Sequence, residues 1–570
     1  MHKHYNDITK TPQARMRDYF NKRLSSLKGE LQSFIPHYKE LSEFIQPRRG
    51  RFFTQDRNKG TKKHSSIINS HASFAHQTAR SGMMAGTMSP ARPWFDLKTY
   101  DPALDEFQPV KEWLFASTTI IRDIFNQSNF YNQAPTLLGE MLLFATGCMS
   151  HVDDFNDVAR FYTHTAGSYM IGQDERLKVN TMVREFEWSV YQIVRDFGYK
   201  NCSVAVQQSW DKGNYDQWYP VVHFVEPNPD YKKNNPLSMF KRFRSVYYEP
   251  SEIHAGKGDG KFLSMKGYDD FPAYVPRWDV TGEDIYGTDC PAMTALGDIK
   301  GLQVEEKRKA QGIDKQVNPP LQGPASLKNV PVSSLPGGLN IFDVNDKNHK
   351  LSSVYDVQID LSALRADIGA VEERINRAFY VDMFLAISQM QGIQPRNELD
   401  LMTRNEERLL MLGPVLERLQ GEFHDALIDH TFNQCLRAGI LPPAPEELQG
   451  RPLRVRYVST LAMAQRAVAT QGIDRIMSYA GNIAGMGWQE VYDKIDADQS
   501  VDEYANALGV PPKIVRSDDA VALIRQQRAE EQKAAAQLEA IQSLANSAKM
   551  ATDAKTGDEN VLTDLAGGAS

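Results

Sequence analysis

The stretch from Pro291 to Thr403 constrains the fold of this chain more than any other. A helical pattern runs from Pro291 to about Gln311, and a proline-rich segment follows, with VNPPLQGP at Val317–Pro324 and LPGG at Leu335–Gly338. A second helix then carries apolar residues spaced three and four apart, at Leu361, Leu364, Ile368, Val371, Ile375 and Ala378. A seam this narrow suits a helix flanked by other helices, including copies from other chains. The pattern therefore predicts assembly rather than catalysis.

The overall composition is that of a folded protein with several structural units. The chain has 570 residues, of which 41% are hydrophobic and 24% charged, and single cores stop growing well below this length. Its most apolar stretch, Leu137 to Met149, is too short to cross a bilayer and contains Glu140. The N-terminus has no apolar signal core, so we expect synthesis in the cytoplasm and no membrane partner. The net charge of −7 argues against coating nucleic acid by bulk attraction.

The first half reads as an α+β body. A long helix is expected from Thr11-Pro12 to near Pro47, kinked or broken at Pro36, because proline removes a helical hydrogen bond. Further helices are expected over 65–90, 107–128 and 133–147. From Arg160 the apolar period changes to two in the runs RFYTHTAGSYMIG, SVAVQQS, WYPVVHFVEP, FRSVYYEP and FLSMKGY, which predicts an antiparallel sheet. A helix over 179–197 is expected to interrupt that sheet.

The second half reads as mainly helical. Gly392 and Pro395 end the second helix of the central pair. Another narrow seam follows at Leu409, Leu412, Leu416, Leu419, Phe423 and Leu427. A last helix is predicted from Ser517 to about Lys549, with a capping serine and acids in its first turn. The small, polar tail 551–570 is expected to be disordered.

One loop concentrates positive charge. Seven basic residues and a single acid, Asp56, lie between Arg48 and Lys63. Binding of phosphate is one interpretation, and a solvated loop is the commoner explanation of such a run.

Motifs for catalysis are missing from the sequence. A phosphate-binding loop would need GxxxxGK[ST], but AGKGDGKF at Ala255–Phe262 has alanine and phenylalanine at the required ends and reads as a hairpin turn. No HExxH or GxSxG occurs, and the four cysteines form no CxxC pair. The spacing of His64, His71 and His76 matches no metal motif, and the acid pairs Asp153-Asp154, Asp269-Asp270 and Asp518-Asp519 are explained by loop ends and helix caps. We therefore expect no catalytic residues, no metal and no cofactor.

Seven segments together resemble the head-to-tail connector, or portal, proteins of short-tailed bacteriophages, from about Met16 to Arg525. GTMSPARPWFDL (Gly86–Leu97) is similar to a signature of that family. Within this segment, Trp94-Phe95 also reads as an apolar anchor. The other six segments are Gly139–Asp154, Arg160–Asp174, Ala295–Leu321, Ala378–Phe384, Leu412–Phe423 and Ser459–Ala467. The order and spacing of all seven make the match specific.

The resemblance implies a portal fold, α+β and mainly helical, in a subunit that forms a ring, usually a dodecamer, at one capsid vertex of the virion. It assigns 1–290 and 404–500 to an α/β wing, 291–312 and 359–390 to a two-helix stem, 313–358 to the clip, 391–403 to a tunnel loop and 501–550 to a C-terminal helical crown. Double-stranded DNA would pass through the channel during packaging and ejection. Further partners would be the terminase, the tail adaptor protein, and the major capsid and scaffolding proteins.

Two groups of residues become site candidates within that resemblance. Arg396 and Arg404 flank the predicted helix break and are candidates for steering DNA in the channel; ordinary surface or inter-subunit charges are an equal alternative. Pro319, Pro320 and Leu321 in the clip are candidates for docking partners. Two other function classes are alternatives: a nuclease or motor subunit of the packaging module, and a helical scaffold that binds membranes or partners. The missing motifs disfavour the former, and the low apolar bulk of the last helix disfavours insertion into a membrane.

Overall fold

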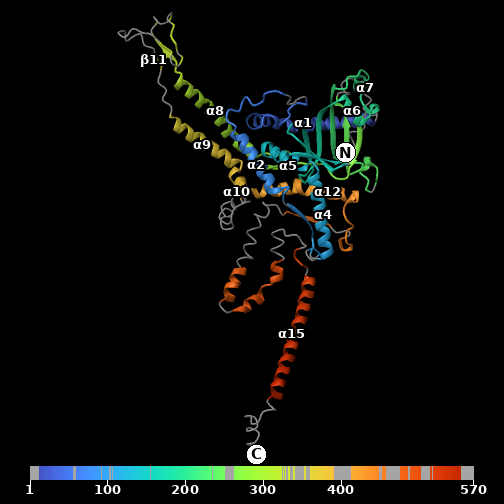
Figure 1. The fold of residues 1–570 in the computed structure, drawn as a ribbon. Helices are drawn as coiled ribbons and strands as arrows, with labels where there is room; N and C mark the ends of the chain where they lie inside the picture. The colour runs from blue at the N-terminus through green and yellow to red at the C-terminus, as the bar shows by residue number, and fades with distance from the viewer. Residues whose placement is uncertain are drawn as a thin grey trace, which may run out of the picture. The chain divides into compact units, whose positions relative to one another are not determined.

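The computed structural model describes the chain from residue 12 onward, except for 55–59, 92, 102–103, 106, 155, 234, 251–261, 324, 326–327, 329–330, 334, 336–337, 340–351, 355–359, 390–411, 449–451, 458–475, 486–487, 502–513, 517 and 554–570. The fold is α+β and mainly helical (Figure 1). The chain forms two compact units. The first contains 1–96, 117–442 and 455–465, and the second contains 97–116, 443–454 and 466–570.

The larger sheet of the first unit is antiparallel and has five strands, in the order β4-β5-β6-β7-β8. Helix α1 lies on one face, where Phe20 meets Phe224 at 5.0 Å between ring centres. Helices α6 and α7 cover the opposite face with a core that includes Phe186, Val190 and Val206. The strands are β4 (Tyr169–Gln173), β5 (Val179–Ser189), β6 (Trp218–Pro227), β7 (Phe243–Tyr248) and β8 (Ser264–Tyr268), and the helices are α1 (Pro12–Ile45), α6 (Val190–Phe197) and α7 (Val204–Asp211).

A smaller antiparallel sheet, β3-β2-β9, packs against helix α5. Its strands are β2 (Cys148–Asp154), β3 (Val158–His164) and β9 (Ala273–Tyr274), and α5 spans Phe130–Phe144. Helix α2 (His71–Thr87) lies along α5. The predicted anchor is confirmed here, since Trp94 and Phe95 are buried and the Trp94 ring stacks near Phe125 and Phe130.

The helical half of the first unit contains α8 (Pro291–Val317), α9 (Leu361–Ala378), α10 (Val381–Gln389), a helix over 412–419, the π-helical turn η8 (Gln420–His424) and α12 (Asp425–Ala438). Short strands β10 (Leu321–Gln322) and β11 (Ser352–Ser353) pair with each other. In the part that the structure describes, the second narrow seam is confirmed, since Leu412, Leu416, Leu419, Phe423 and Leu427 are all buried. Its first member, Leu409, lies outside the described residues.

The second unit ends in the long helix α15 (Asp518–Asp553). A pair of hydrogen bonds from Arg525 to the two carboxylate oxygens of Asp498, at 2.7 and 2.8 Å, ties this helix to the preceding helical residues 497–501. The remaining elements are α4 (Gln108–Gln127), β1 (Phe95–Thr99) paired with β12 (Leu453–Tyr457), a helix over 476–485, and the short turns η2 (Tyr199–Asn201), η3 (Ser238–Phe240), η9 (Glu446–Leu448) and η10 (Gln489–Lys494). None of the helices that the structure describes is long and apolar enough to cross a bilayer.

Two predictions in the sheet region are wrong. The expected helix over 179–197 is strand β5 as far as Ser189, and only Val190–Phe197 is helical. Apolar residues at Val179, Met182, Val183 and Phe186 mimic a helical period, because β5 is a central strand with apolar neighbours on both faces. The expected strand SVAVQQS is helix α7, whose N-cap Ser203 accepts a hydrogen bond from the Val206 backbone N–H.

Helix α1 runs through Pro36 to Ile45, so of the kink or break expected there the break does not occur; Ile35, Tyr38 and Leu41 around the proline are buried and hold the helix in place. Two helix boundaries differ from expectation. Helix α8 continues past Gln311 to Val317. Helix α15 runs to Asp553, so the first three residues of the predicted tail are helical, and the rest of that tail lies outside the described residues.

Candidate functional site: the α8–α9 hairpin and its anchor

Helices α8 and α9 form a long hairpin with β10 and β11 at its far end (Figure 1). The apolar seam predicted for α9 is confirmed where the structure describes its side chains: Ile368, Val371 and Ile375 are buried and Leu364 is half-buried. Hydrophobic burial along this seam is the main force that holds the hairpin closed. Arg374 on α9 adds an ion pair with Asp298 on α8 at 3.0 Å.

The outer face of α8 carries Val304, which is 45% exposed and apolar. Two more exposed apolar residues, Ile313 and Val317, lie further along the helix and about half a turn around its axis from Val304, so they are not on the face of Val304. Gly297 and Gly301 lie on the same face as Val304, and a Cβ added at either would meet no atom within 4 Å. This face is therefore open to a further helix.

The base of the hairpin is held by a polar clamp built around Asn69. The side-chain carbonyl of Gln303 accepts hydrogen bonds from the backbone N–H groups of Ile68 and Asn69, at 2.7 and 2.8 Å, and its amide donates to the Asn69 carbonyl at 2.9 Å. The Asn69 side chain donates to Glu306 on α8 and to Glu372 on α9. The segment before α2 thus binds both arms of the hairpin at once.

A sharp turn separates α9 from α10. Tyr380 adopts a left-handed backbone conformation with φ +56°, so the single helix expected over 359–390 is divided into two. Helix α10 then packs on α2, where Gly82 faces Phe384. A Cβ at Gly82 would overlap the Phe384 side chain, so glycine is required for this close approach.

The predicted clip residues lie at the far end of the hairpin. Pro319 is half-buried, Pro320 is exposed, and Leu321 is 50% exposed at the start of β10. The Pro320 carbonyl accepts a hydrogen bond from the Val354 N–H at 2.9 Å, which joins the two ends of the segment. The predicted channel residues Arg396 and Arg404 lie outside the described residues, as does the whole of 391–403.

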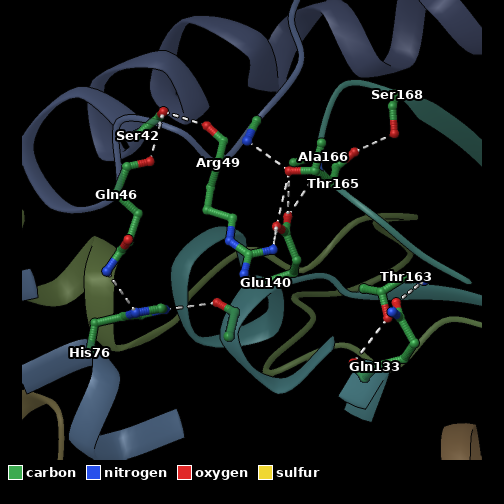
Figure 2. Close-up of polar contacts among 12 residues, drawn as sticks. Ser42, Gln46, Arg49, His76, Gln133, Glu140, Thr163, Thr165, Ala166 and Ser168 are labelled. Carbon is green, nitrogen blue, oxygen red and sulfur yellow. Dashed lines mark hydrogen bonds and ion pairs between the residues drawn. The ribbon is translucent and has the colours of Figure 1, made fainter. Parts of the chain in front are cut away.

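The basic loop after α1 is partly used for structure. Figure 2 shows Arg49 reaching the buried carboxylate of Glu140, 3.4 Å away. Glu140 also accepts hydrogen bonds from the Thr165 hydroxyl and the Ala166 N–H, both at 3.0 Å. Burial raises the pKa of Glu140, and the Arg49 charge opposes that rise. Arg49 is therefore engaged with a carboxylate and does not serve the phosphate interpretation of this loop.

His71, His76 and the four cysteines, which match no metal motif in the sequence, have structural roles or are buried. His76 is buried between Gln46 and the Gly139 carbonyl, and burial lowers its pKa to about 4 (Figure 2). His71 instead hydrogen-bonds Asn376 on α9 at 2.9 Å. All four cysteines are buried and free. The segment AGKGDGKF lies outside the described residues except for Phe262.

One group of side chains has the residue types that could hold a metal, and only its Asp153 stands out in the sequence. Among the described residues, only His151, Asp153 and His430 bring three ligand atoms within 4.8 Å of one another. Both ring nitrogens of His151 already have partners, since Tyr274 lies 2.6 Å from Nδ1 and Gln434 lies 2.9 Å from Nε2. This histidine reads as a satisfied part of the core.

Comparison with known proteins shows the family to which the chain belongs. A family model described as "Bacteriophage head to tail connecting protein" matches residues 17–515. The chain belongs to this family. It is 43% identical over 544 residues to the "Probable portal protein" of Bordetella phage BPP-1, which spans 95% of this chain and 96% of that protein. It is 39% identical over 548 residues to the "Portal protein" of Salmonella phage epsilon15, over 96% and 97% of the two chains.

One similar solved structure is the "Neck of empty GTA particle computed with C6 symmetry". It covers 82% of this chain and 98% of its own, at 10% sequence identity and a TM-score of 0.35. That similarity is too weak to bear on the arrangement of this chain.

Family membership confirms the resemblance seen in the sequence. The chain is a phage portal, or head–tail connector, protein and a component of the virion at the junction of head and tail. It is a structural protein and not an enzyme, which excludes the alternative of a nuclease or motor subunit.

Few sequence signals point to the residues that hold the hairpin in place. Asn69 and Gln303 are ordinary polar residues whose partners lie more than 230 positions away in the chain. Gly82 lies in a run of small residues, which is a weak signal for close helix packing. For Glu140, a charge within an apolar stretch is the one sequence signal of the buried ion pair.

Proposed function

We propose that copies of this connector close into a ring, usually a dodecamer, at one capsid vertex and form a passive channel for DNA. In this ring 291–312 and 359–390 are the stem helices around the channel, 313–358 is the clip and 391–403 is the tunnel loop. Residues 1–290 and 404–500 form the wing, and 501–550 form the crown. Double-stranded DNA passes through the ring during packaging and again during ejection.

The observation that carries this proposal is the uncovered face of α8. On this face Val304 is exposed and apolar, and Gly297 and Gly301 leave room for a partner helix, while the seam of α9 is already filled by α8. A neighbouring copy that packs here would bury this face, and a head-to-tail contact repeated with a closing rotation gives a ring.

The clip residues Pro319, Pro320 and Leu321 are proposed to dock the terminase during packaging and the tail adaptor afterwards. Leu321 supplies exposed apolar surface, and the two prolines stiffen the backbone before it, which lowers the entropy lost on binding. The major capsid and scaffolding proteins are the proposed partners of the wing.

Assembly is tested by negative-stain images of the purified chain. We expect rings with a central hole for the unmodified protein. The double substitution Gly297→Asp with Val304→Asp is expected to leave separate subunits, because both positions lie on the open face of α8 and the change puts charge into the proposed contact. Val204→Asp, at an exposed position of α7, is the matched control and should still form rings. Rings from the α8 double variant would contradict this role for the helix.

The channel role of Arg396 and Arg404 is tested in assembled particles. Replacing both with glutamine removes two positive charges per copy near the proposed constriction, and we expect less DNA per particle. Arg195→Gln, on an exposed site of α6, is the control. An unchanged DNA content in the double variant would show that the two arginines are ordinary surface charges.

A further inference from the structure

A cavity of about 240 Å³ lies between the loop after α1 and the two β-sheets of the first unit. Three arginines line it: Arg48 and Arg51 from the loop, and Arg184 from the middle of β5. None of the described residues that line it is an aspartate or glutamate. The cavity is therefore strongly positive, which is unusual in a chain with a net charge of −7.

Arg184 is the group that most needs a partner. Its Nε is buried without a hydrogen bond, and its guanidinium lies 4.9 Å from the centre of the Phe186 ring. Burial lowers the pKa of Arg184, and the charge of Arg51 lowers it further. Among the residues that the structure describes, no carboxylate forms an ion pair with it. Burying such a charge is costly unless an opposite charge compensates it.

The two histidines beside Arg184 cannot supply that opposite charge. His164 lines the cavity, and His223 lies opposite Arg184 on strand β6. Burial lowers the pKa of both histidines, and the Arg184 charge lowers it further, so both are neutral or, at most, positive. The compensating negative charge must therefore come from outside this group of side chains.

The loop that carries Arg51 is fixed in place before any ligand arrives. The Arg51 N–H donates to the Ala166 carbonyl at 2.8 Å, and the Gly50 N–H donates to the Thr165 hydroxyl at 2.7 Å. Gly167, with φ +85°, lets the Arg51 carbonyl approach so closely that a Cβ there would overlap it. A rigid loop holds the Arg51 backbone at a constant place beside the cavity, which reduces the entropy lost on binding.

We propose that the cavity between Arg51 and Arg184 binds a phosphate oxyanion, either a free phosphate ion or a phosphodiester group of DNA. Two guanidinium groups can each donate a pair of parallel hydrogen bonds to phosphate oxygens. A doubly charged phosphate ion would offset both arginine charges, and the single charge of a phosphodiester would offset one. The hydroxyl groups of Thr163, Thr165 and Ser168 already donate elsewhere, so the arginines provide the donors.

Binding is measured by equilibrium dialysis of the full chain against labelled inorganic phosphate at constant pH and ionic strength. We expect saturable binding of one phosphate per chain. Arg184→Met is expected to weaken it by about tenfold or more, the usual effect of losing a charged hydrogen-bonding partner. The control Arg195→Met changes an exposed arginine of α6 and should bind phosphate as the unmodified chain does.

A thermal unfolding measurement separates this role from a structural one. Without phosphate, Arg184→Met should be at least as stable as the unmodified chain, because an uncompensated buried charge has been removed. With phosphate, only chains that retain Arg184 should gain stability. If Arg184→Met fails to fold, Arg51→Met is used for the same comparison.

A short DNA duplex added to the dialysis identifies the source of the phosphate. Displacement of the labelled ion by the duplex, at unchanged ionic strength, assigns the site to the DNA backbone. Retention of the ion assigns it to free phosphate. No saturable binding, or binding that neither Arg184→Met nor Arg51→Met weakens, would overturn the proposal.

Discussion

Substitution of Gln303 tests whether the polar clamp holds the base of the α8–α9 hairpin. This side chain is 5% exposed and makes three hydrogen bonds to the backbone of Ile68 and Asn69, at 2.7, 2.8 and 2.9 Å. The substitution Gln303→Ala removes all three. It leaves two N–H groups and one carbonyl without their partners, at the point where both helices are tied to the segment before α2.

The free-energy cost of Gln303→Ala depends on how many of these three backbone groups form a hydrogen bond to water instead. If water replaces Gln303, each lost hydrogen bond costs about 1 kcal/mol, whereas a group that stays dry costs about 1–3 kcal/mol. Three groups then give a total of roughly 3 kcal/mol or more. The contacts are local, so the loss should show first as easier opening of this segment. At 1.4 kcal/mol for each tenfold change, a cost of about 3 kcal/mol raises the equilibrium constant for local opening by roughly a hundredfold.

Hydrogen exchange measured on peptides that cover 64–73 gives a direct assay, because the Ile68 and Asn69 amides are the ones released. Gln316→Ala, at an exposed position of the same helix, controls for the change in helix propensity. We expect faster exchange in 64–73 only for Gln303→Ala. Equal exchange in the two variants would refute the conclusion that Gln303 anchors the hairpin.

Three further predictions follow from the structure. Gly82→Ala should destabilise the chain by about 1–3 kcal/mol, because the new Cβ overlaps Phe384, whereas Gly29→Ala has open space and should stabilise α1 by up to ~1 kcal/mol. Urea unfolding measures both changes, and equal shifts would contradict the close contact between α2 and α10. Burial lowers the pKa of His223 to about 3, so below about pH 6.5 the folded state binds fewer protons than the unfolded state and loses stability as the pH falls towards 3. His223→Gln should therefore reduce the slope of the unfolding free energy against pH in this range by an amount equal to about one bound proton; an unchanged slope would count against the buried neutral histidine. Leu321→Ser should leave ring formation intact but weaken attachment of the tail adaptor, measured by co-sedimentation of the two proteins; full attachment would rule out Leu321 as a docking residue.

Helix seams and aromatic anchors were predictable because they depend on local periodicity. The buried members of the α9 seam, Ile368, Val371 and Ile375, lie where their spacing placed them, and so does Trp94. The strand β5 was missed because a central strand with apolar neighbours on both faces loses the alternation that distinguishes strand from helix.

Tertiary contacts explain what the sequence could not predict. The turn between α9 and α10 requires Tyr380 to adopt positive φ, which no local signal announces because tyrosine rarely does so. The cavity at Arg184 depends on a loop more than 130 residues earlier in the chain. The basic run at Arg48–Lys63 did mark that loop, but its charge alone could not tell that Arg49 pairs with Glu140 while Arg51 lines the cavity.

The central claim is that identical copies surround one channel where the head joins the tail. Quantitative mass spectrometry of purified virions, combined with labelling of this chain for electron microscopy, measures both the number of copies and their place. The account predicts about twelve copies per particle, all at a single vertex. One or two copies per particle, or label spread over the capsid, would contradict it.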